Sequence, residues 1–343
     1  MKFINLLSAV AASASLASAQ KAVADTEIPA GARIEPRLET QEIIDGAQRT
    51  TINYGPYQIP PNGMLSKPTL RAETPCKDCF VTAIQANILY LDGKVANVNT
   101  GAWLHHMVIT SGISPIFASG NERTPLRVNG KYKYGIELDA RSSFMFITDL
   151  MSLSSETQTV NMAITYEWIP KARATGYRDV YMKWNDVGQP NAREGQYSFK
   201  SRESAVTVSG RLLYTNGHVH DGGTHTILYV DGKEACKSVM LYGRRPGFSE
   251  AGSEGAGATE TPAAGHDAGA HEHRRDLVAR QGHGGHAGSL HISDSSTCVD
   301  FGDVRSGQKM HVEAFYDSDK YPLMEHNGEK EKLMGIMRVY VGS

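Results

Sequence analysis

The sequence lacks several features that mark common functional classes. Acidic and basic residues nearly cancel, with 37 Asp+Glu against 35 Lys+Arg in 343 residues, so the basic face that nucleic-acid binding requires is not expected. Neither a G-x-G-x-x-G nor a G-x-x-x-x-G-K-[ST] motif is present, which argues against a nucleotide-binding α/β enzyme. After residue 19 no apolar run is long enough to span a bilayer, so we expect no membrane partner. Helical periodicity of useful length is lacking as well.

The first residues have the pattern of a secretory signal peptide. A lysine at position 2 is followed by an apolar run to residue 16, and an Ala-Ser-Ala cleavage site occupies residues 17–19. We therefore expect residues 1–19 to be a signal peptide and the mature protein to be extracellular.

The four cysteines should be paired in an oxidising compartment. Cys76 and Cys79 form a C-x-x-C that has neither a second such pair nor a βαβ context. A local disulfide is therefore expected there, rather than a redox or zinc site. By elimination, Cys236 is expected to pair with Cys298.

Between Cys236 and Cys298 the composition changes abruptly to Gly, Ala, Glu and His. We expect a disordered insertion at 245–292, because it holds too few large apolar side chains to form a core. A solvated loop and a weak metal-capturing tract both remain open as interpretations, since neutral imidazole binds copper and zinc. With its edges, this tract contains six of the 13 histidines: His266, His271, His273, His283, His286 and His291.

Elsewhere, short alternating segments separated by Gly-containing turns predict antiparallel β-sandwiches. A polar stretch at 173–195 marks a linker, which separates a domain at 51–172 from a domain at 196–343. Residues 20–50 are expected to form an N-terminal arm. The expected strands are Phe80–Leu91, Leu104–Thr110, Ser143–Leu150, Thr159–Tyr166, Ala205–Tyr214, Thr226–Val230, Met310–Tyr316 and Leu333–Val341.

Histidines outside the insertion are the candidate metal ligands. His218 and His220 are two residues apart on an expected strand, so both side chains point to one face and could bind one metal. Met334 lies on the face of the last strand opposite the apolar face of Met337, and a thioether with two imidazoles suits copper. Core packing stays open for Met334 and is the expectation for Met337.

A second pair, His105 and His106, consists of adjacent residues. Adjacent side chains of a regular strand point to opposite faces. The two imidazoles can therefore bind one metal only at a bulge or at the end of a strand.

In their order and spacing, His105-His106-Met107, His218-Val219-His220 and Met334 resemble the copper type II, ascorbate-dependent monooxygenases. That family includes peptidylglycine α-hydroxylating monooxygenase and dopamine β-monooxygenase, and the chain looks most like a secreted fungal branch. The resemblance implies an all-β fold of two tandem jelly-roll β-sandwich domains, with a copper in each, facing one another across a solvent-filled cleft. It also implies that copper at His218, His220 and Met334 activates O2, whereas His105 and His106 hold an electron-transfer copper that ascorbate reduces.

Two departures from that family are visible. Thr165 stands where the electron-transfer copper takes its third histidine, and 107–217 contains no histidine. The positions that anchor a peptide carboxylate in the amidating enzyme hold Asn216, Ile336 and Arg338, so peptide amidation is not expected. The sequence therefore predicts a secreted monooxygenase with one or two copper ions that acts with O2 on a small organic substrate. A non-catalytic secreted protein that binds or scavenges copper is the alternative.

Overall fold

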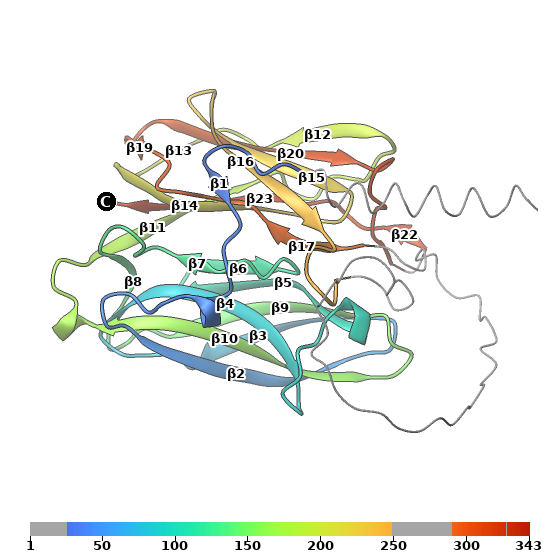
Figure 1. Cartoon of the computed structure of the whole chain (residues 1–343), viewed down its shortest axis with the longest axis horizontal. Coiled ribbons are helices and arrows are strands. Elements are labelled where there is room, and N and C mark those ends of the chain that lie inside the picture. The colour runs from blue at the N-terminus through green and yellow to red at the C-terminus, as the bar shows by residue number, and fades with distance from the viewer. Residues whose placement is uncertain (1–25, 249–289, 327) are drawn as a thin grey trace, which may run out of the picture.

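The structure is a computed structural model and describes residues 26–248, 290–326 and 328–343 (Figure 1). Within these residues there is no α-helix, and the strands account for nearly all regular structure, so the all-β prediction is confirmed. In the same ranges, no helix has the length and apolar character needed to cross a membrane. The predicted signal peptide at 1–19 lies outside the described residues. Three short 3-10 helices are η1 (Leu38–Thr40), η2 (Val98–Thr100) and η3 (Lys171–Arg173).

The strands fall into two halves of the chain, with β1 (Ala32–Arg33) ahead of both. The N-terminal half, residues 48–170, contains β2 (Gln48–Ile59), β3 (Met64–Ala72), β4 (Cys79–Tyr90), β5 (Ala102–Ser111), β6 (Ser114–Gly120), β7 (Leu126–Arg127), β8 (Tyr134–Leu138), β9 (Phe144–Ser152) and β10 (Gln158–Pro170). The C-terminal half, residues 178–343, contains β11 (Arg178–Asp186), β12 (Gln196–Lys200), β13 (Ser204–Ala205), β14 (Gly210–Val219), β15 (Gly223–Val230), β16 (Lys233–Tyr242), β17 (Ile292–Ser295), β18 (Thr297–Val299), β19 (Asp303–Val304), β20 (Lys309–Asp317), β21 (Glu325–His326), β22 (Glu329–Lys330) and β23 (Gly335–Gly342).

The N-terminal half consists of two sheets packed face to face. A four-stranded sheet with the order β3-β9-β5-β6 covers the β8-β4-β10-β2 end of an eleven-stranded sheet. In the shared core, β5 contributes Leu104, Met107 and Ile109, each at most 1% exposed. Burying a side chain of this kind contributes about 1.5–3 kcal/mol. Because these residues fix the inner face of β5, its alternate residues face away from the N-terminal core.

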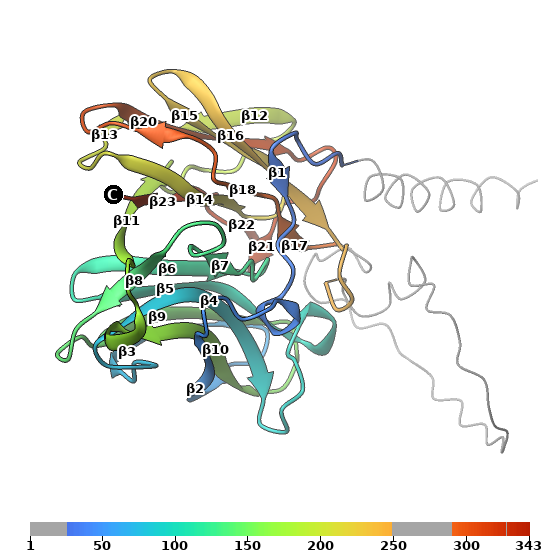
Figure 2. The same cartoon turned by 60° about the vertical axis from the view of Figure 1, so that its left-hand side comes forward.

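The C-terminal half has a similar arrangement of layers. A six-stranded sheet, β12-β20-β15-β16-β17 with β13 beside β20, packs on the β11, β23, β14 and β18 end of the eleven-stranded sheet. Leu228 and Val312 from the six-stranded sheet meet Val339 of β23 in one core, and Met337 is buried in it as predicted. The parallel pair β8–β11 joins the two ends of the large sheet, so the halves are continuous (Figure 2). The jelly-roll connectivity of tandem domains stays a prediction.

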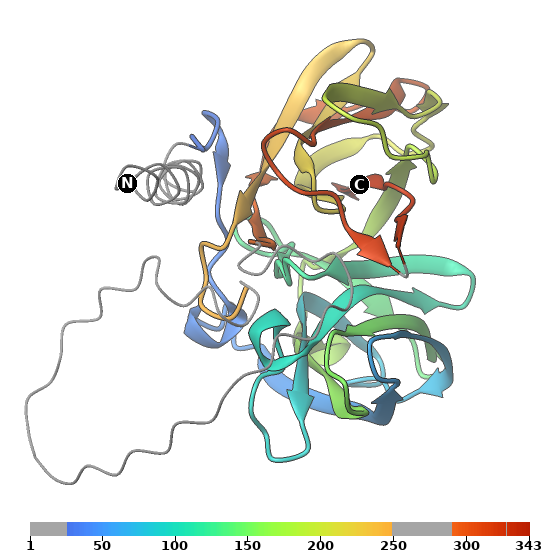
Figure 3. The same cartoon turned by 90° about the vertical axis from the view of Figure 1, so that its right-hand side faces the viewer.

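The segments predicted to flank the domains also contribute strands. The arm predicted at 20–50 contains β1, which pairs with β18 of the C-terminal half, before the chain crosses to β2 in the N-terminal half (Figure 3). The linker predicted at 173–195 is wrong in part, because it contains β11, which pairs along its length with β23. Lys183 and Asn185 are buried polar residues of β11, so the strand does not show an apolar alternation.

The insertion predicted at 245–292 is too wide at both edges. Phe248 is 1% exposed, and Ile292 begins β17 and is buried. His291 is also buried, so it belongs to the fold rather than to the tract. The other five histidines of the tract, His266, His271, His273, His283 and His286, lie outside the described residues. Both predicted disulfides, Cys76–Cys79 and Cys236–Cys298, are present.

Candidate metal centre

A β-bulge brings the adjacent histidines of β5 toward the same side of the sheet. In the pairing of β5 with β9, Leu104 lies opposite Leu150 and His106 lies opposite Asp149, which leaves His105 as the extra residue. A bulge is the distortion that two neighbouring imidazoles need in order to face one metal. Their ring centroids are 3.9 Å apart, so this condition from the sequence is met.

The H-x-H pair lies at the end of β14, on the face that is directed toward the N-terminal half. His218 and His220 are both buried, and their ring centroids are 6.0 Å apart. Directly after them the chain turns at Gly222, whose φ of +91° favours glycine. The turn leads into β15, so the pair stands at the rim of its sheet.

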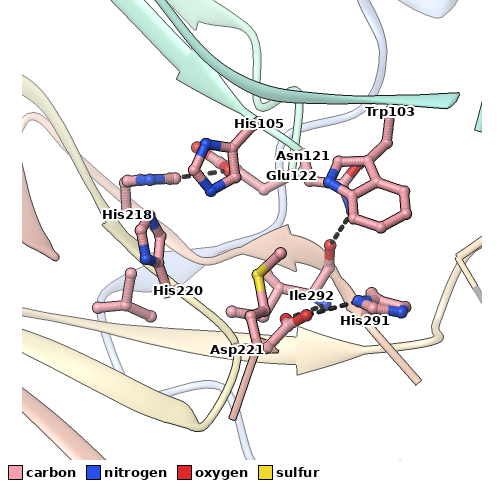
Figure 4. Close-up of a pocket in the computed structure, with 11 residues that line it drawn as sticks. Trp103, His105, Asn121, Glu122, His218, His220, Asp221, His291 and Ile292 are labelled. Atoms are coloured by element: carbon pink, nitrogen blue, oxygen red, sulfur yellow. Dashed lines mark hydrogen bonds and ion pairs between the residues drawn. The ribbon is translucent and has the colours of Figure 1, made fainter. Parts of the chain in front are cut away.

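The two histidine pairs meet in one cluster, which we call the four-histidine cluster (His105, His106, His218 and His220). The Nε2 atoms of His106 and His220 are 2.9 Å apart. The ring of His105 lies 4.8 Å from that of His220, and the ring of His106 lies 5.0 Å from that of His218. Figure 4 shows His105, His218 and His220 gathered on one side of a pocket. The two pairs, expected to face one another across a solvent-filled cleft, therefore lie in direct contact, and how many copper ions they hold stays a prediction.

Each imidazole of the cluster has one nitrogen directed at an acceptor outside the cluster. His218 Nδ1 lies 3.1 Å from a carboxylate oxygen of Glu122, and His105 Nε2 lies 3.2 Å from one of Glu331. His220 Nδ1 is 2.7 Å from the carbonyl oxygen of Lys332. The fourth ring, His106, has its Nδ1 3.6 Å from an Asp149 carboxylate oxygen. Such partners favour a proton on the outer nitrogen, which leaves the inner nitrogen as a lone-pair donor.

Two of the outer partners, both carboxylates, belong to the half of the molecule opposite to that of the histidine they orient. Glu122 of the N-terminal half orients His218 of the C-terminal half, and Glu331 of the C-terminal half orients His105 of the N-terminal half. The cluster is therefore complete only when the two halves are docked.

The inner nitrogens fit a metal ion. His105 Nδ1 and His218 Nε2 are buried and have no hydrogen-bond partner, which is costly for a polar atom unless a ligand satisfies it. His220 donates its Nδ1–H to a carbonyl, so its Nε2 presents a lone pair to His106 at 2.9 Å. That separation is near the roughly 3.3 Å expected for two nitrogens on one tetrahedral metal. One ligand nitrogen from each of His105, His106 and His220 lies within 4.8 Å of the others.

Two of the four imidazoles, His106 and His220, favour the neutral form, which is the form that binds a metal. Burial, followed by the charges of His105 and His218, lowers the pKa of His220 to about 3. Burial also lowers the pKa of His106 well below its usual value, with smaller contributions from the other three rings. Burial opposes the charged form of Glu122, but His218 and then Arg338 outweigh it and lower the pKa of this carboxyl to about 2.

Gly120 provides the close approach that lets the halves meet. It pairs with His106 across β5 and β6, and its backbone amide donates to Glu122. A Cβ atom placed on Gly120 would lie only 2.6 Å from His218 Nδ1 and 2.6 Å from a Glu122 carboxylate oxygen. The His218 ring therefore occupies the space that any side chain at this position would fill.

Thr165 is not part of the cluster. It lies on β10 of the large sheet, where its hydroxyl is 2.9 Å from that of Thr51 at the surface. The residue that stands opposite His106 is Asp149, on the neighbouring strand β9. The assignment of Thr165 to the position of a third histidine is therefore wrong, because β10 belongs to a different sheet from β5.

The predicted ligand Met334 is placed by strand register alone. The register of β14 with β23 pairs Val219 with Gly335, so the next pair along would be His220 with Met334. The wall of the pocket contains a different methionine, Met324, which packs near Trp103. Sequence periodicity indicated the first and offered no signal for the second.

Arg338, one of the positions that differ from the peptide-anchoring residues of the amidating enzyme, is engaged by the fold. Arg338 is buried, and its guanidinium donates to the carbonyl of Ala118 and, at 2.6 Å, to the side chain of Asn216. It therefore braces the interface between the halves.

Sequence reasoning missed the residues that orient the cluster. Glu122 has no acidic neighbour, and Glu331 lies in a charged Glu-Lys-Glu-Lys run that is typical of exposed chain. Asp221, whose carboxylate accepts a 2.5 Å hydrogen bond from His291, follows directly after the H-x-H pair. The return of apolar residues at Leu290 and Ile292 was the available signal that His291 lies in ordered structure.

Comparison with known proteins finds fungal relatives. No family model matches the chain. It is 25% identical over 315 residues to a Phoma sp. protein named "Probable copper-dependent oxygenase M1", covering 84% of this chain and 71% of the relative. It is 24% identical over 279 residues to "Probable copper-dependent oxygenase clz3" of Cochliobolus lunatus, covering 75% of this chain and 78% of the relative.

Similarity to solved structures is low. The STIV major capsid protein aligns with a TM-score of 0.35 and 9% identity, over 86% of this chain and 97% of the other. The glycosylasparaginase PNGase F of Flavobacterium meningosepticum aligns with a TM-score of 0.36 and 8% identity, over 86% and 96%. These values do not assign the fold to a family. At the sequence level, the chain is a distant homologue of fungal proteins named as copper-dependent oxygenases.

Proposed function

We propose that this protein is a secreted copper-dependent oxygenase whose metal centre is the four-histidine cluster. The observation that carries the proposal is the arrangement of four imidazoles, each with one nitrogen directed at an outer acceptor and the other nitrogen directed into the cluster. Imidazole suits copper in both of its common oxidation states. The names of the two distant fungal homologues favour copper and oxygen chemistry over other uses of such a site.

Copper bound in the cluster would supply one-electron redox chemistry for the activation of O2. The finer proposal is a monooxygenase related to the ascorbate-dependent family, built from two jelly-roll domains, which hydroxylates a small organic substrate with ascorbate as reductant. In this proposal His218 and His220 are metal ligands at the catalytic site. His105 and His106 become ligands of the same centre, rather than of a remote electron-transfer site.

The role of the protein groups follows from their positions. Glu122, Asp149 and Glu331 fix the orientation of three rings and place negative charge around a bound cation. Burial lowers the pKa of His106 and of His220 and so favours the neutral form of these two rings. We propose Met334 as a thioether ligand, because the strand register directs it to the position opposite His220.

Metal content and oxygen uptake test this function together. Purified protein loaded with copper is expected to consume O2 when ascorbate is added, and the double variant His218→Ala/His220→Ala is expected to lose both bound copper and uptake. Replacement of Thr165 by Ala serves as the matched control, since that residue lies on another sheet. Unchanged copper content in the double variant would contradict the assignment of the centre.

A secreted copper-binding protein without catalysis is the second candidate. The merging of both histidine pairs into one cluster favours it, because no separate histidine pair is left within the described residues to hold an electron-transfer copper. Tight copper binding without ascorbate-dependent O2 uptake, under conditions that include organic extracts of a fungal culture, would support this candidate over the enzyme.

A further inference from the structure

The pocket beside the four-histidine cluster is too small for an organic molecule. The space left free in it is about 20 Å³, which is room for one or two water molecules. Its apolar wall residues are already packed, since Trp103 is 3% exposed and Ile292 is 4% exposed. A molecule of more than a few atoms therefore reaches the cluster only if part of the wall moves aside.

Much of the wall is held by the large sheets. Trp103 belongs to β5, Val219 to β14 and Ile292 to β17, and the backbone hydrogen bonds of the ladders fix these strands. Asn121, in the loop after β6, donates to the carbonyl of Ile292 at 3.3 Å. Met324 differs, because it stands at the start of a short hairpin that belongs to neither half's sheets.

Residues 324–331, which we call the β21–β22 hairpin, form a two-stranded sheet of their own. Glu325 pairs with Lys330, and the amide of Glu331 donates to the carbonyl of Met324 at 2.9 Å. Among the described residues neither strand pairs with a further strand, and Figure 2 shows both between the two halves of the molecule. A two-stranded hairpin without sheet neighbours is only marginally stable, so this element moves at low cost.

Both ends of the hairpin contact the N-terminal half. Met324 packs against Trp103 in the wall of the pocket. At the other end, a carboxylate oxygen of Glu331 lies 3.2 Å from His105 Nε2. Because both contacts lie on one short element, they break together when the hairpin moves away from the N-terminal half.

The chain on either side of the hairpin is fixed. Before it, Tyr321 is buried and stacks on Tyr242, with ring centroids 3.8 Å apart. After it, Leu333 is buried, and its amide donates to the carbonyl of Pro190 at 2.9 Å. The hairpin therefore has two firm bases about which it can turn.

An exposed ion pair fastens the hairpin to the loop between β11 and β12. It joins Lys330 to Glu194, and the two side chains are 39% and 75% exposed. Exposed ion pairs contribute little to stability, so this contact opens readily. Its strength can also be changed by substitutions that touch neither the pocket nor the cluster.

We propose that the β21–β22 hairpin is a lid over the metal centre, which lifts about its bases to admit an organic molecule. In lifting, it takes Met324 out of the wall and Glu331 away from His105. Entry of the molecule is therefore coupled to the orientation of one histidine of the cluster, whereas a molecule of two heavy atoms has room with the lid closed. The proposal rests on the proposed function for the identity of the molecule as substrate, but not for the movement of the lid.

Carbon monoxide and benzyl isocyanide test the lid, because both bind copper(I) through carbon but differ in size. Each is mixed with full-length copper(I)-loaded protein in the absence of O2, and the rate of binding is measured by stopped flow. Lys330→Glu, which repels Glu194, is expected to raise the rate for benzyl isocyanide about 2- to 10-fold and to leave that for carbon monoxide unchanged. The charge reversal Glu194→Lys/Lys330→Glu is expected to restore the wild-type rate.

The matched control is Lys94→Glu, which breaks an exposed pair with Asp92 in the N-terminal half and should change neither rate. A benzyl isocyanide rate that Lys330→Glu leaves unchanged would overturn the lid. So would an equal acceleration of both probes, or copper-loaded protein that binds carbon monoxide but no benzyl isocyanide.

Hydrogen exchange of the backbone amides at 324–331 gives a readout that needs no metal. In metal-free protein, exchange there is expected to be faster in Lys330→Glu than in the wild type or in Lys94→Glu, and equal exchange would contradict the lid. Copper content is measured on the same preparations. Protein that takes up no copper but shows the faster exchange contradicts the proposed function alone, whereas copper-loaded protein without the isocyanide effect contradicts only the lid.

Discussion

The Nε2 atoms of His106 and His220 lie 2.9 Å apart, although the two residues are 114 positions apart in the chain and belong to different halves of the molecule. Each ring has its other nitrogen directed outward, toward Asp149 and toward the carbonyl of Lys332. Because His220 donates its Nδ1–H to Lys332, the 2.9 Å contact is a hydrogen bond from His106 Nε2–H to the lone pair of His220 Nε2, and a metal bound here would replace that proton. The relationship thus ties the docking of the halves to the binding of a metal.

Substitution of Gly120 tests the close contact between the halves. Gly120→Ala is expected to displace His218 and Glu122, because its Cβ would lie 2.6 Å from atoms of both. Overpacking of this kind costs about 1–3 kcal/mol, so we expect a lower free energy of unfolding together with weaker copper binding. Urea unfolding and copper titration measure the two effects. Gly130→Ala is the control, since nothing lies within 4 Å of a Cβ there and Gly130 has no positive φ; equal behaviour of the two variants would contradict the account.

Replacement of Glu122 and Glu331 tests whether these carboxylates orient the histidine ligands. Glu122→Gln and Glu331→Gln each keep the size of the side chain but remove the negative charge beside His218 and His105. Loss of such an outer partner typically weakens metal binding about 10- to 100-fold. Chelator competition gives the affinity, and the copper(II) EPR spectrum is expected to shift in both variants. Glu137→Gln, which breaks a surface pair with Lys171, should leave affinity and spectrum unchanged.

The proposed thioether ligand can be tested against its neighbour in the pocket. X-ray absorption of the copper(I) protein is expected to show a sulfur scatterer that disappears in Met334→Leu. Met324→Leu preserves volume in the pocket wall and is expected to retain the sulfur signal. The opposite result, with the signal lost in Met324→Leu alone, would transfer the ligand role to Met324.

The buried histidines make the metal-free protein sensitive to acid. The pKa of His220 is lowered from 6.5 to about 3 by burial, and burial also lowers that of His106. Below about pH 6.5 the unfolded chain therefore binds protons that the folded protein does not, and stability falls as the pH drops toward 3. Urea unfolding at pH 7 and pH 5 is expected to show a larger loss for the wild type than for His106→Gln/His220→Gln. A double variant with the same pH dependence as the wild type would refute this origin.

Local sequence patterns predict the strands and the ligand pairs but not how the halves dock. The alternation in β4, β5, β9 and β20 placed those strands within about two residues, because one face of each is packed in a core. The segment predicted at Ala205–Tyr214 misses the end of β14, since it spans the turn after β13. That shift matters little for His218 and His220, whose spacing alone places them on one face.

The composition of the centre depends on contacts that no local pattern encodes. The meeting of β5 with β14 requires Gly120 at the contact and the Arg338 hydrogen bonds across it, and these residues come from distant parts of the chain. The orienting residues Glu122 and Glu331 are recognisable only once the strands are in place. For the same reason the sequence, which predicted one or two copper ions, did not indicate that the two histidine pairs form one cluster.

Anomalous diffraction at the copper edge from crystals of the copper-loaded protein tests the central claim most directly. The account predicts anomalous density inside the four-histidine cluster, in contact with histidines from both halves of the molecule. Two well-separated copper positions, one on His105 and His106 and the other on His218 and His220, would contradict it.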